Sequence, residues 1–251
     1  MRTLGVDLAS SDERTACAVL AWAGGRAALV ALEHGLAPRA DRAAPSPGDL
    51  RILALAEGAQ AIGIDAPFGW PAPFHALLAG ARPAAWSDER RDALRFRRTD
   101  FAVRRLGGFW PLSVSSDLVA LPALRCQGLL AALGVVDRAT NGRIFEVYPR
   151  LGLTRWGLDR TGTGYKGKEG RARREEIVAS LTARCPWLAL GPHAATLCAE
   201  DHALDALLAA LLAHAAACGL VEPIPDEDLA FARTEGWIAV PAEGSLDRLP
   251  R

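Results

Sequence analysis

The stretch Asp201-His-Ala-Leu-Asp205-Ala-Leu-Leu-Ala-Ala places two acidic residues on an otherwise apolar sequence that favours a helix. Residues four apart lie one turn apart on the same helix face, so both carboxylates face the same side. Packing gives an apolar helix no reason to carry two acids there, and two carboxylates held close are costly unless a proton or a cation lies between them. The stretch therefore predicts a long helix, residues 195–218, that presents Asp201 and Asp205 to a divalent metal ion.

Two more aspartates end predicted strands. The first strand closes with Gly-Val-Asp7, and a later buried strand closes with Ile-Gly-Ile-Asp65. Ligands of open α/β sheets bind at the carboxyl ends of the strands, so we expect the acidic helix to cross the sheet above Asp7. A third strand, residues 143–148, carries Glu146 and adds one more acid to the candidate set.

This set of carboxylates predicts metal-dependent phosphodiester chemistry. Hard divalent cations such as Mg²⁺ take carboxylate and water oxygens, and we expect Mg²⁺ or Mn²⁺ as the cofactor. Two such ions about 3.5–4 Å apart activate the attacking water and stabilise the leaving oxygen. Any one of these acids could instead cap an element or pair with an arginine, but their joint placement favours a metal site. The predicted catalytic acids are Asp7, Asp65, Glu146, Asp201 and Asp205.

The order of the predicted elements indicates one α/β domain, residues 1–251. Three antiparallel strands open the chain, with a hairpin turn at Gly24-Gly25, and a crossover helix and a further strand follow to give the order βββαβ. The mixed sheet then gains parallel strands and is flanked by helices. The predicted elements are strands 3–8, 15–22, 27–33 and 61–65, helix 49–58, a helical arginine-rich insertion at 72–115, helix 116–133, strand 143–148, a glycine-rich loop at 162–170, helix 171–183, helix 195–218 and a final strand at 235–241.

These motifs resemble the RNase H-like fold. A three-stranded antiparallel start with Asp7 on its first strand looks like that fold, and Asp201-x-x-x-Asp205-Ala-Leu looks like the last helix of the RuvC-type Holliday-junction resolvases, which share it. More specifically, the chain resembles a bacterial family of predicted nucleases, domain of unknown function 429, over nearly its whole length. The motifs that carry this resemblance are Gly-Val-Asp7, Gly-Ile-Asp65-Ala-Pro-Phe-Gly-Trp-Pro71, Arg98-Thr-Asp100, Glu146-Val-Tyr-Pro149, Tyr165-Lys166, Asp201 with Asp205-Ala-Leu, and Glu235-Gly-Trp-Ile.

The resemblance implies roles for individual residues. The metal ligands would be Asp7, Asp65 and Asp205, with Asp201 and Glu146 as supporting acids. The resolvases have a glutamate where Asp65 stands, and the shorter side chain changes the reach of this ligand. The residues implied in substrate binding are Trp70, Arg98, Tyr165 and Lys166.

The predicted insertion is rich in groups that bind phosphates. From Glu89 to Arg105 there are seven arginines against three acids, with aromatic residues interleaved. Arginine binds phosphate oxygens in a bidentate manner, and aromatic rings stack on bases. The same pattern also suits a solvated helix face with aromatics packed inward. We expect a nucleic-acid partner, DNA or RNA, and Arg98 is the arginine that also matches the family motif.

The bulk composition narrows the class of protein. The net charge of zero gives the molecule no global attraction to nucleic acid or membrane, so any attraction must be local. Five cysteines without C-x-x-C spacing argue against zinc sites and disulfides. There is no signal-peptide pattern, and the longest apolar stretch is too short to span a bilayer, so we expect a cytoplasmic protein without a membrane partner.

Two alternatives to a nuclease stay open. One is a protein that binds Mg-ATP on the related actin/sugar-kinase version of the fold, although that version usually has two repeated halves and the sequence has no repeat. The other is a non-catalytic nucleic-acid-binding protein whose acids no longer hold metal, for which the zero net charge argues mildly.

Overall fold

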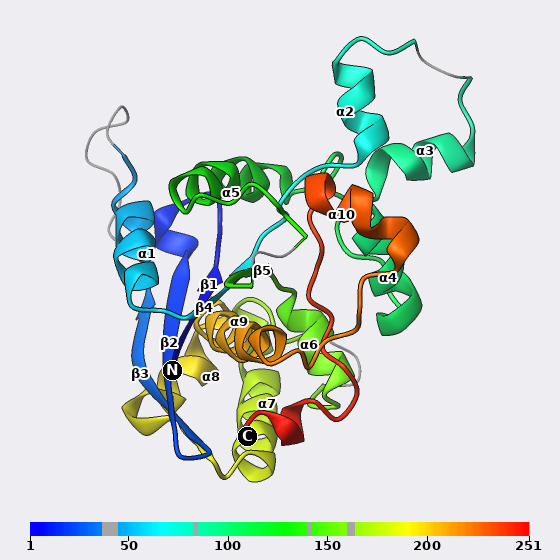
Figure 1. The fold of residues 1–251 in the computed structure, drawn as a ribbon. Helices are drawn as coiled ribbons and strands as arrows, with labels where there is room; N and C mark the ends of the chain where they lie inside the picture. Colours follow the sequence, from blue (N-terminus) through cyan, green and yellow to red (C-terminus); the bar gives the residue numbers. More distant parts are fainter. Residues whose placement is uncertain (37–44, 83–84, 140–141, 160–163, 251) are drawn as a thin grey trace.

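The computed structural model describes residues 1–36, 45–82, 85–139, 142–159 and 164–250. Within them, six strands form one mixed sheet of order β5-β4-β1-β2-β3-β6 (Figure 1). The first three strands pair antiparallel, whereas β4, β5 and β6 each run parallel to a neighbour. The predicted class of a mixed α/β fold is therefore confirmed. The strands are β1 (Arg2–Asp7), β2 (Ala16–Ala23), β3 (Arg26–His34), β4 (Ala61–Asp65), β5 (Ile144–Glu146) and β6 (Leu188–Ala189).

The hairpin between β2 and β3 follows the sequence prediction. Gly24 and Gly25 have φ values of 55° and 71°. Both central residues of a type I′ turn need positive φ, which glycine adopts without steric cost. The predicted strands 3–8, 15–22, 27–33 and 61–65 begin and end within one residue of β1 to β4.

Helices cover both faces of the sheet. In Figure 1, α1 and α5 lie on one face, and α6, α7, α8 and α9 lie on the other. In the predicted insertion, α2 and α3 project away from the sheet and α4 packs beside α10, so the expected helical pieces are confirmed. The helices are α1 (Pro47–Glu57), α2 (Ala72–Leu78), α3 (Asp88–Arg95), α4 (Arg98–Gly107), α5 (Ala120–Ala132), α6 (Pro149–Arg155), α7 (Arg171–Arg184), α8 (Ala194–Ala199), α9 (Asp201–Ala217) and α10 (Leu229–Glu235).

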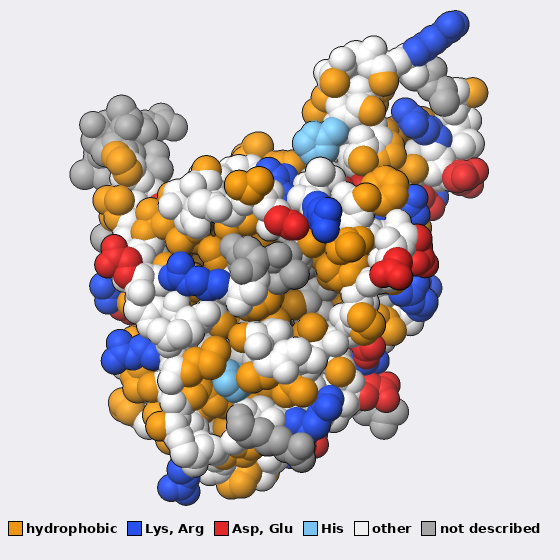
Figure 2. All heavy atoms as spheres, in the orientation of Figure 1, with side chains coloured by type: hydrophobic (Ala, Val, Ile, Leu, Met, Phe, Trp, Pro, Cys, Tyr) orange, Lys and Arg blue, Asp and Glu red, His pale blue; other side chains and the backbone are white. Residues whose placement is uncertain are grey.

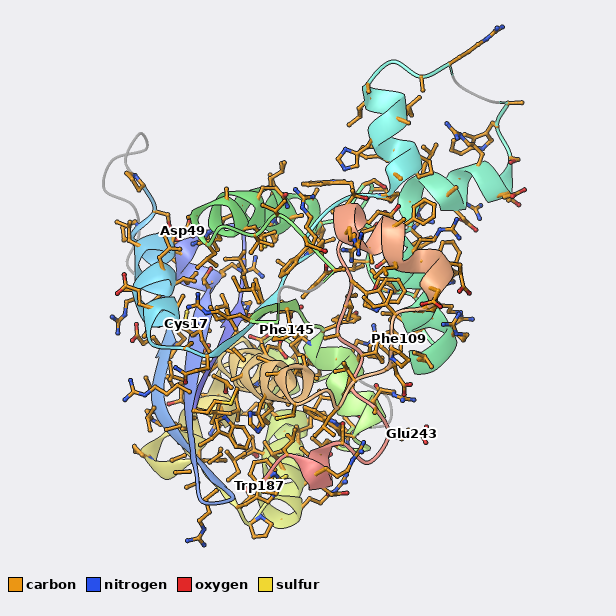
Figure 3. The ribbon with its side chains drawn as sticks, in the orientation of Figure 1. Cys17, Asp49, Phe109, Phe145, Trp187 and Glu243 are labelled. Atoms are coloured by element: carbon orange, nitrogen blue, oxygen red, sulfur yellow. The ribbon has the colours of Figure 1, made fainter. Side chains whose placement is uncertain are left out.

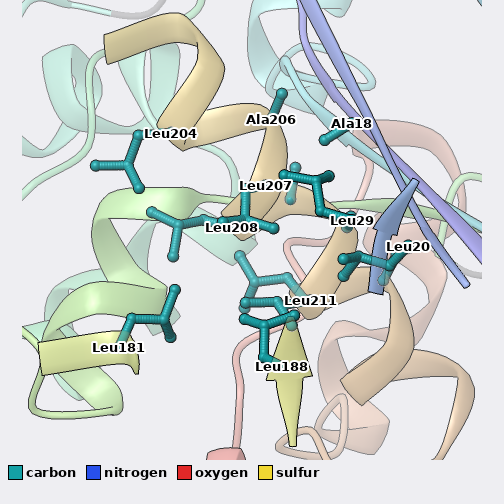
Figure 4. Close-up of a cluster of buried hydrophobic side chains, with 14 of the residues drawn as sticks. Ala18, Leu20, Leu29, Leu181, Leu188, Leu204, Ala206, Leu207, Leu208 and Leu211 are labelled. Carbon is teal, nitrogen blue, oxygen red and sulfur yellow. The ribbon is translucent and has the colours of Figure 1, made fainter. Parts of the chain in front are cut away.

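The alternation of side chains along the strands builds two separate cores. Leu4 and Val6 of β1 pack with α1 and α5 in one core. The other core centres on α9, whose leucines contact β2, β3 and α7 (Figure 4). Because successive side chains of a strand point to opposite faces, the residues between the apolar positions face α9, and Asp7 is one of them.

Two glycines let α9 lie directly on the sheet. Gly5 and Gly63 are paired neighbours on β1 and β4. A Cβ atom at Gly5 would lie 2.0 Å from the backbone oxygen of Ala206, and one at Gly63 would lie 2.4 Å from that of Ala209. Contacts that short are impossible, so the close approach of α9 requires glycine at both positions.

The predicted helix 195–218 is two helices. Glu200 is extended, with φ −118° and ψ 116°, so α8 ends at Ala199 and Asp201 is the first residue of α9. Arg174 donates hydrogen bonds to the carbonyl oxygens of Cys198 and Ala199, at 2.9 and 2.8 Å. These contacts satisfy carbonyl groups at the end of α8 that a continuous helix would bond internally.

The boundaries of two other predicted elements were wrong. The predicted helix 116–133 begins only at Ala120, because the Asp117 carboxylate accepts a hydrogen bond from the Ser113 backbone in the preceding turn, at 2.6 Å. The predicted strand 143–148 ends at Glu146, and Pro149 opens α6 instead of only closing the strand, a position that suits proline.

The end of the chain also differs from the prediction. The predicted strand 235–241 was wrong, because Glu235 ends α10 and the residues after it make isolated bridges from Ile238 and Pro241. The two-residue strand β6 had not been predicted. Residues 162 and 163 of the predicted glycine-rich loop lie outside the described residues.

Candidate metal centre

Three aspartates meet at one end of the sheet. Asp7 and Asp65 end the neighbouring parallel strands β1 and β4 and are paired in register. Asp205 stands one turn into α9, which crosses both strands. One carboxylate oxygen from each lies within 4.8 Å of the others. The sequence prediction that these three acids converge is confirmed, whereas their role as metal ligands stays a prediction.

Burial and mutual repulsion make this cluster electrostatically strained. Burial, followed by the charges of Asp7 and Asp205, raises the pKa of Asp65 well above its usual value. Asp205 is 0 % exposed, and burial raises its pKa to about 6, with Lys166 opposing the shift and Asp7 adding to it. A bound cation would stabilise the ionised form of both carboxyl groups and so remove this strain.

A lysine and a tyrosine reach the buried acid from the loop before α7. The Lys166 ammonium forms an ion pair with Asp205, and the Tyr165 hydroxyl donates a hydrogen bond to Asp205 Oδ1 at 3.0 Å. Burial lowers the pKa of Lys166, but the charges of the three aspartates outweigh this and raise it above its usual value. Lys166 therefore stays protonated beside the cluster.

Asp201 holds this loop and lies outside the triad. Its carboxylate accepts a hydrogen bond from the Gly167 backbone at 2.8 Å and another from the His202 backbone at 3.1 Å. Burial opposes ionisation, but these hydrogen bonds and nearby positive charges lower the pKa of Asp201. The two acids of the opening stretch thus have separate partners, with Asp205 in the triad and Asp201 on the loop.

Arg174 anchors the same loop from beneath, a role that the sequence analysis missed. Its guanidinium, 2 % exposed, donates to the carbonyl oxygens of Tyr165 at 2.5 Å and Gly167 at 2.8 Å. A signal was present, because Arg174 falls on the stripe of α7 whose other members, Ile177, Val178 and Leu181, are buried. An arginine on a buried stripe needs several acceptors, and here backbone carbonyls supply them.

His202 borders the triad on the other side. Its Nδ1 contacts an Asp7 carboxylate oxygen, and this hydrogen bond, although burial opposes it, raises the pKa of His202. Its Nε2 lies 4.0 Å from Asp201 Oδ1. The imidazole is thus held between two acids and can be charged near neutral pH.

The triad opens into a cleft of about 590 Å³. Acidic, basic and apolar groups share its walls, and Asp7 and Asp65 belong to them. The other lining residues are Leu8, Ala9, Arg14, Ala66, Pro67, Leu112, Val119, Pro122, Tyr148, Arg150, Gly164, Tyr165, Lys166 and His202. On the face drawn in Figure 2, acidic and basic side chains are interspersed over the surface, so recognition of an anion depends on local groups such as these.

Comparison with protein families gave one match. The family described as "Protein of unknown function (DUF429)" matches residues 5–230, which include all three aspartates of the triad. This chain belongs to the DUF429 family. Comparisons with curated proteins and with solved structures each found no match. Among the described helices of this DUF429 protein, none has both the length and the apolar character that a membrane span requires.

Glu146 occupies a different environment from the triad. It is 2 % exposed, pairs with Arg97 at 2.8 Å and accepts a hydrogen bond from the Phe68 backbone at 3.0 Å. Arg97 also pairs with Asp100 at 3.1 Å. Burial raises the pKa of Glu146 despite these contacts. In this DUF429 chain, the buried network ties β5 to the start of α4, so Glu146 has the arginine partner that the sequence analysis kept as an alternative.

The four predicted substrate-binding residues fall into two groups. Tyr165 and Lys166 line the cleft of the triad. Arg98 lies over the Phe231 ring at 4.6 Å and lines another cavity, of about 410 Å³, between α3, α4 and α10. Trp70 meets His75 edge to face, with ring centroids 6.2 Å apart. Arg98 of the arginine-rich insertion therefore borders a separate cavity. The cations that line the cleft of the triad, Arg14, Arg150 and Lys166, belong to other segments.

Proposed function

We propose that this DUF429 protein is a divalent-metal-dependent nuclease of the RNase H-like fold that acts in the cytoplasm. The observation that carries the proposal is the convergence of Asp7, Asp65 and Asp205, with carboxylate oxygens within 4.8 Å of one another. Three sequential antiparallel strands followed by parallel ones, with an acid at the end of β1, support the fold assignment.

The donor set fits Mg²⁺ or Mn²⁺. The triad consists of carboxylates alone, the ligands that such hard cations prefer. The raised pKa values of Asp65 and Asp205 reflect a local excess of negative charge that a divalent ion would neutralise. When bound by the three aspartates, the ion would supply Lewis-acid catalysis of phosphodiester hydrolysis.

The neighbouring side chains suit the remaining tasks of this reaction. Lys166 stays protonated and half exposed, so its ammonium can contact a phosphate oxygen while it pairs with Asp205. Tyr165 orients the Asp205 carboxylate through its hydroxyl. His202 can accept or donate a proton at Nε2, because its Nδ1 is engaged with Asp7.

The proposal is tested by turnover of two substrate classes. Wild-type protein and Asp7→Asn are incubated with Mg²⁺ or Mn²⁺ and with single-stranded, branched or RNA–DNA hybrid nucleic acid, and separately with ATP. Cleavage of a polynucleotide by wild type, lost in Asp7→Asn, supports the nuclease. Release of phosphate from ATP alone, lost in the same variant, would favour the Mg-ATP-binding alternative, and no turnover of either substrate would favour the non-catalytic nucleic-acid-binding protein.

A further inference from the structure

Arg150, at the start of α6, lines the cleft of the triad and forms no ion pair with any described residue. Within the described parts of the chain, its buried Nε atom has no hydrogen-bond partner and no carboxylate lies within ion-pair distance of it. A buried donor without an acceptor is costly to maintain. This is the condition expected of an arginine that awaits an anionic ligand.

The position of the Arg150 guanidinium is set by aromatic side chains. Its central carbon lies 4.0 Å from the centroid of the Phe109 ring, and Figure 3 shows Phe109 between α4 and α6. Phe109 in turn packs edge to face on Tyr148, with centroids 6.0 Å apart. Stacking holds the guanidinium plane, and its Nε–H has no acceptor among the described residues, an arrangement suited to phosphate binding.

Tyr148 connects Arg150 with the triad. Burial raises the pKa of Tyr148, and the charge of Asp65 adds to this shift. Arg150, through its charge and a hydrogen bond, and Lys166, through its charge, lower the pKa of Tyr148. The phenol therefore lies within electrostatic range of both cations and of one acid of the triad. Arg150 and Lys166 line the cleft from different segments of the chain, and Asp7 and Asp65 line it with them.

The charges of the cleft favour an anion once a metal is bound. Three permanent cations, Arg14, Arg150 and Lys166, line the cleft. With a divalent ion bound, the three aspartates would be ionised, and the charge of the ion together with these cations would exceed theirs. Leu112, Val119 and Pro122 also line the cleft, and this apolar wall suits the organic part of a ligand.

We propose that Arg150 and Lys166 form a phosphate-binding subsite beside the triad, with the organic part of the phosphate ester against the apolar wall. The subsite rests on the proposed function, because it positions a phosphoester next to the metal-binding aspartates. It assigns substrate anchoring to Arg150 rather than to the arginines of the insertion.

Calorimetric titration with inorganic phosphate in the presence of Mg²⁺ tests the subsite, and titration with Mg²⁺ alone is measured separately. Arg150→Met should weaken phosphate binding about ten-fold or more, equivalent to about 1.4 kcal/mol, with Mg²⁺ binding unchanged. Arg150→Lys, which keeps the charge but not the planar fork, should give a smaller loss and serves if the methionine variant folds poorly. Arg26→Met is the control, since Arg26 is exposed at the opposite end of the sheet.

The outcomes separate the two proposals. No phosphate binding by wild type, or equal affinity in wild type and both Arg150 variants, would overturn the subsite. Phosphate binding that depends on Arg150, without any binding of Mg²⁺, would support the subsite and contradict the metal-dependent nuclease. A nucleoside monophosphate should bind more tightly than inorganic phosphate because of the apolar wall, and it should lose the same factor in Arg150→Met.

Discussion

Gly5 of β1 and Gly63 of β4 lie side by side in the sheet, and the backbone of α9 rests against both. The register continues for two more residues, to the pair Asp7 and Asp65. The close approach of α9 at the glycines therefore brings Asp205 within reach of both aspartates. The candidate metal centre depends on backbone packing two residues away from it.

Gly5→Ala should unfold the protein or strongly destabilise it. The new Cβ would lie 2.0 Å from the Ala206 carbonyl oxygen and 2.2 Å from the Ala210 nitrogen, so α9 must move away from the sheet. Overpacking typically costs about 1–3 kcal/mol, and a clash with several backbone atoms of α9 should reach or exceed the upper end of this range. Thermal or urea unfolding measures the loss.

Gly128→Ala is the matched control for this substitution. Gly128 is exposed within α5, and an added Cβ there meets nothing within 4 Å. Alanine in a helix interior is favoured over glycine by about 0.5–1 kcal/mol, so this variant should be slightly more stable than wild type. Equal stability of the two variants would contradict the packing of α9 on the sheet.

The sequence predicts the triad because its signals are local. Asp7 and Asp65 each end a short apolar strand, and the parallel pairing of such strands brings their ends together. Asp205 follows from helical spacing. No local signal separates Glu146 from these acids, because its partner Arg97 is 49 residues away in the chain and the pairing exists only in the folded structure.

The break between α8 and α9 could not be predicted for a similar reason. No glycine or proline interrupts residues 194–217, and the carbonyl groups at the end of α8 are satisfied by Arg174, which is contributed by another helix. The same tertiary contacts decide that Asp201 binds the Gly167 loop and does not join Asp205. The spacing of Asp201 and Asp205 predicts that they share a helix face. The partners of each acid, however, depend on which segments pack against that face.

Asp65→Asn should stabilise the metal-free protein and abolish stabilisation by Mg²⁺. The pKa of Asp65 is higher in the folded protein than in the unfolded protein. The carboxyl group therefore contributes fully to the stability of the fold only below the unfolded pKa, about 3.9. This contribution is lost as pH rises through the folded value. At pH 7 the wild-type carboxylate therefore weakens the fold, and the neutral amide removes this penalty.

Thermal unfolding with and without Mg²⁺ measures both effects. Without metal, the Tm of Asp65→Asn should exceed that of wild type at pH 7, and the difference should vanish toward pH 4. With Mg²⁺ the order should reverse, because the ion stabilises the state that binds it. Burial raises the pKa of Asp205 to about 6, so the Mg²⁺ effect on wild type should also weaken below that pH. A Tm unaffected by Mg²⁺ in both proteins would contradict the metal centre.

Arg97→Met should destabilise the fold far more than Arg98→Met. Arg97 is buried between Asp100 and Glu146, and its removal leaves two buried carboxylates without a cation. Breaking a buried pair in this way costs about 3–5 kcal/mol. The Arg98 side chain is 53 % exposed, and its ion pair with Asp228 is long, at 3.9 Å. Its removal should therefore cost about 0–1 kcal/mol.

Glu146→Gln separates a structural role of this acid from a catalytic one. The amide keeps the shape of the side chain and one acceptor for the Phe68 backbone, but it loses the charge that pairs with Arg97. We expect lower stability in urea unfolding and an unchanged Mg²⁺ affinity in calorimetry. A clear loss of Mg²⁺ affinity in a stably folded Glu146→Gln would return this residue to the metal centre.

Arg174→Met should expose the loop that carries Lys166 to proteolysis. The only two lysines of the chain, Lys166 and Lys168, both lie in or next to this loop, so a lysine-specific protease reports on it alone. Arg174 donates to the carbonyl oxygens of Tyr165 and Gly167 and thereby holds the backbone on both sides of Lys166. Cleavage of the native protein requires local opening, which becomes more frequent when these hydrogen bonds are lost.

Arg171→Met is the control, since Arg171 pairs with Glu175 on the exposed face of α7. Cleavage after Lys166 should be faster in Arg174→Met and unchanged in Arg171→Met, and equal rates in both variants would show that Arg174 does not anchor the loop.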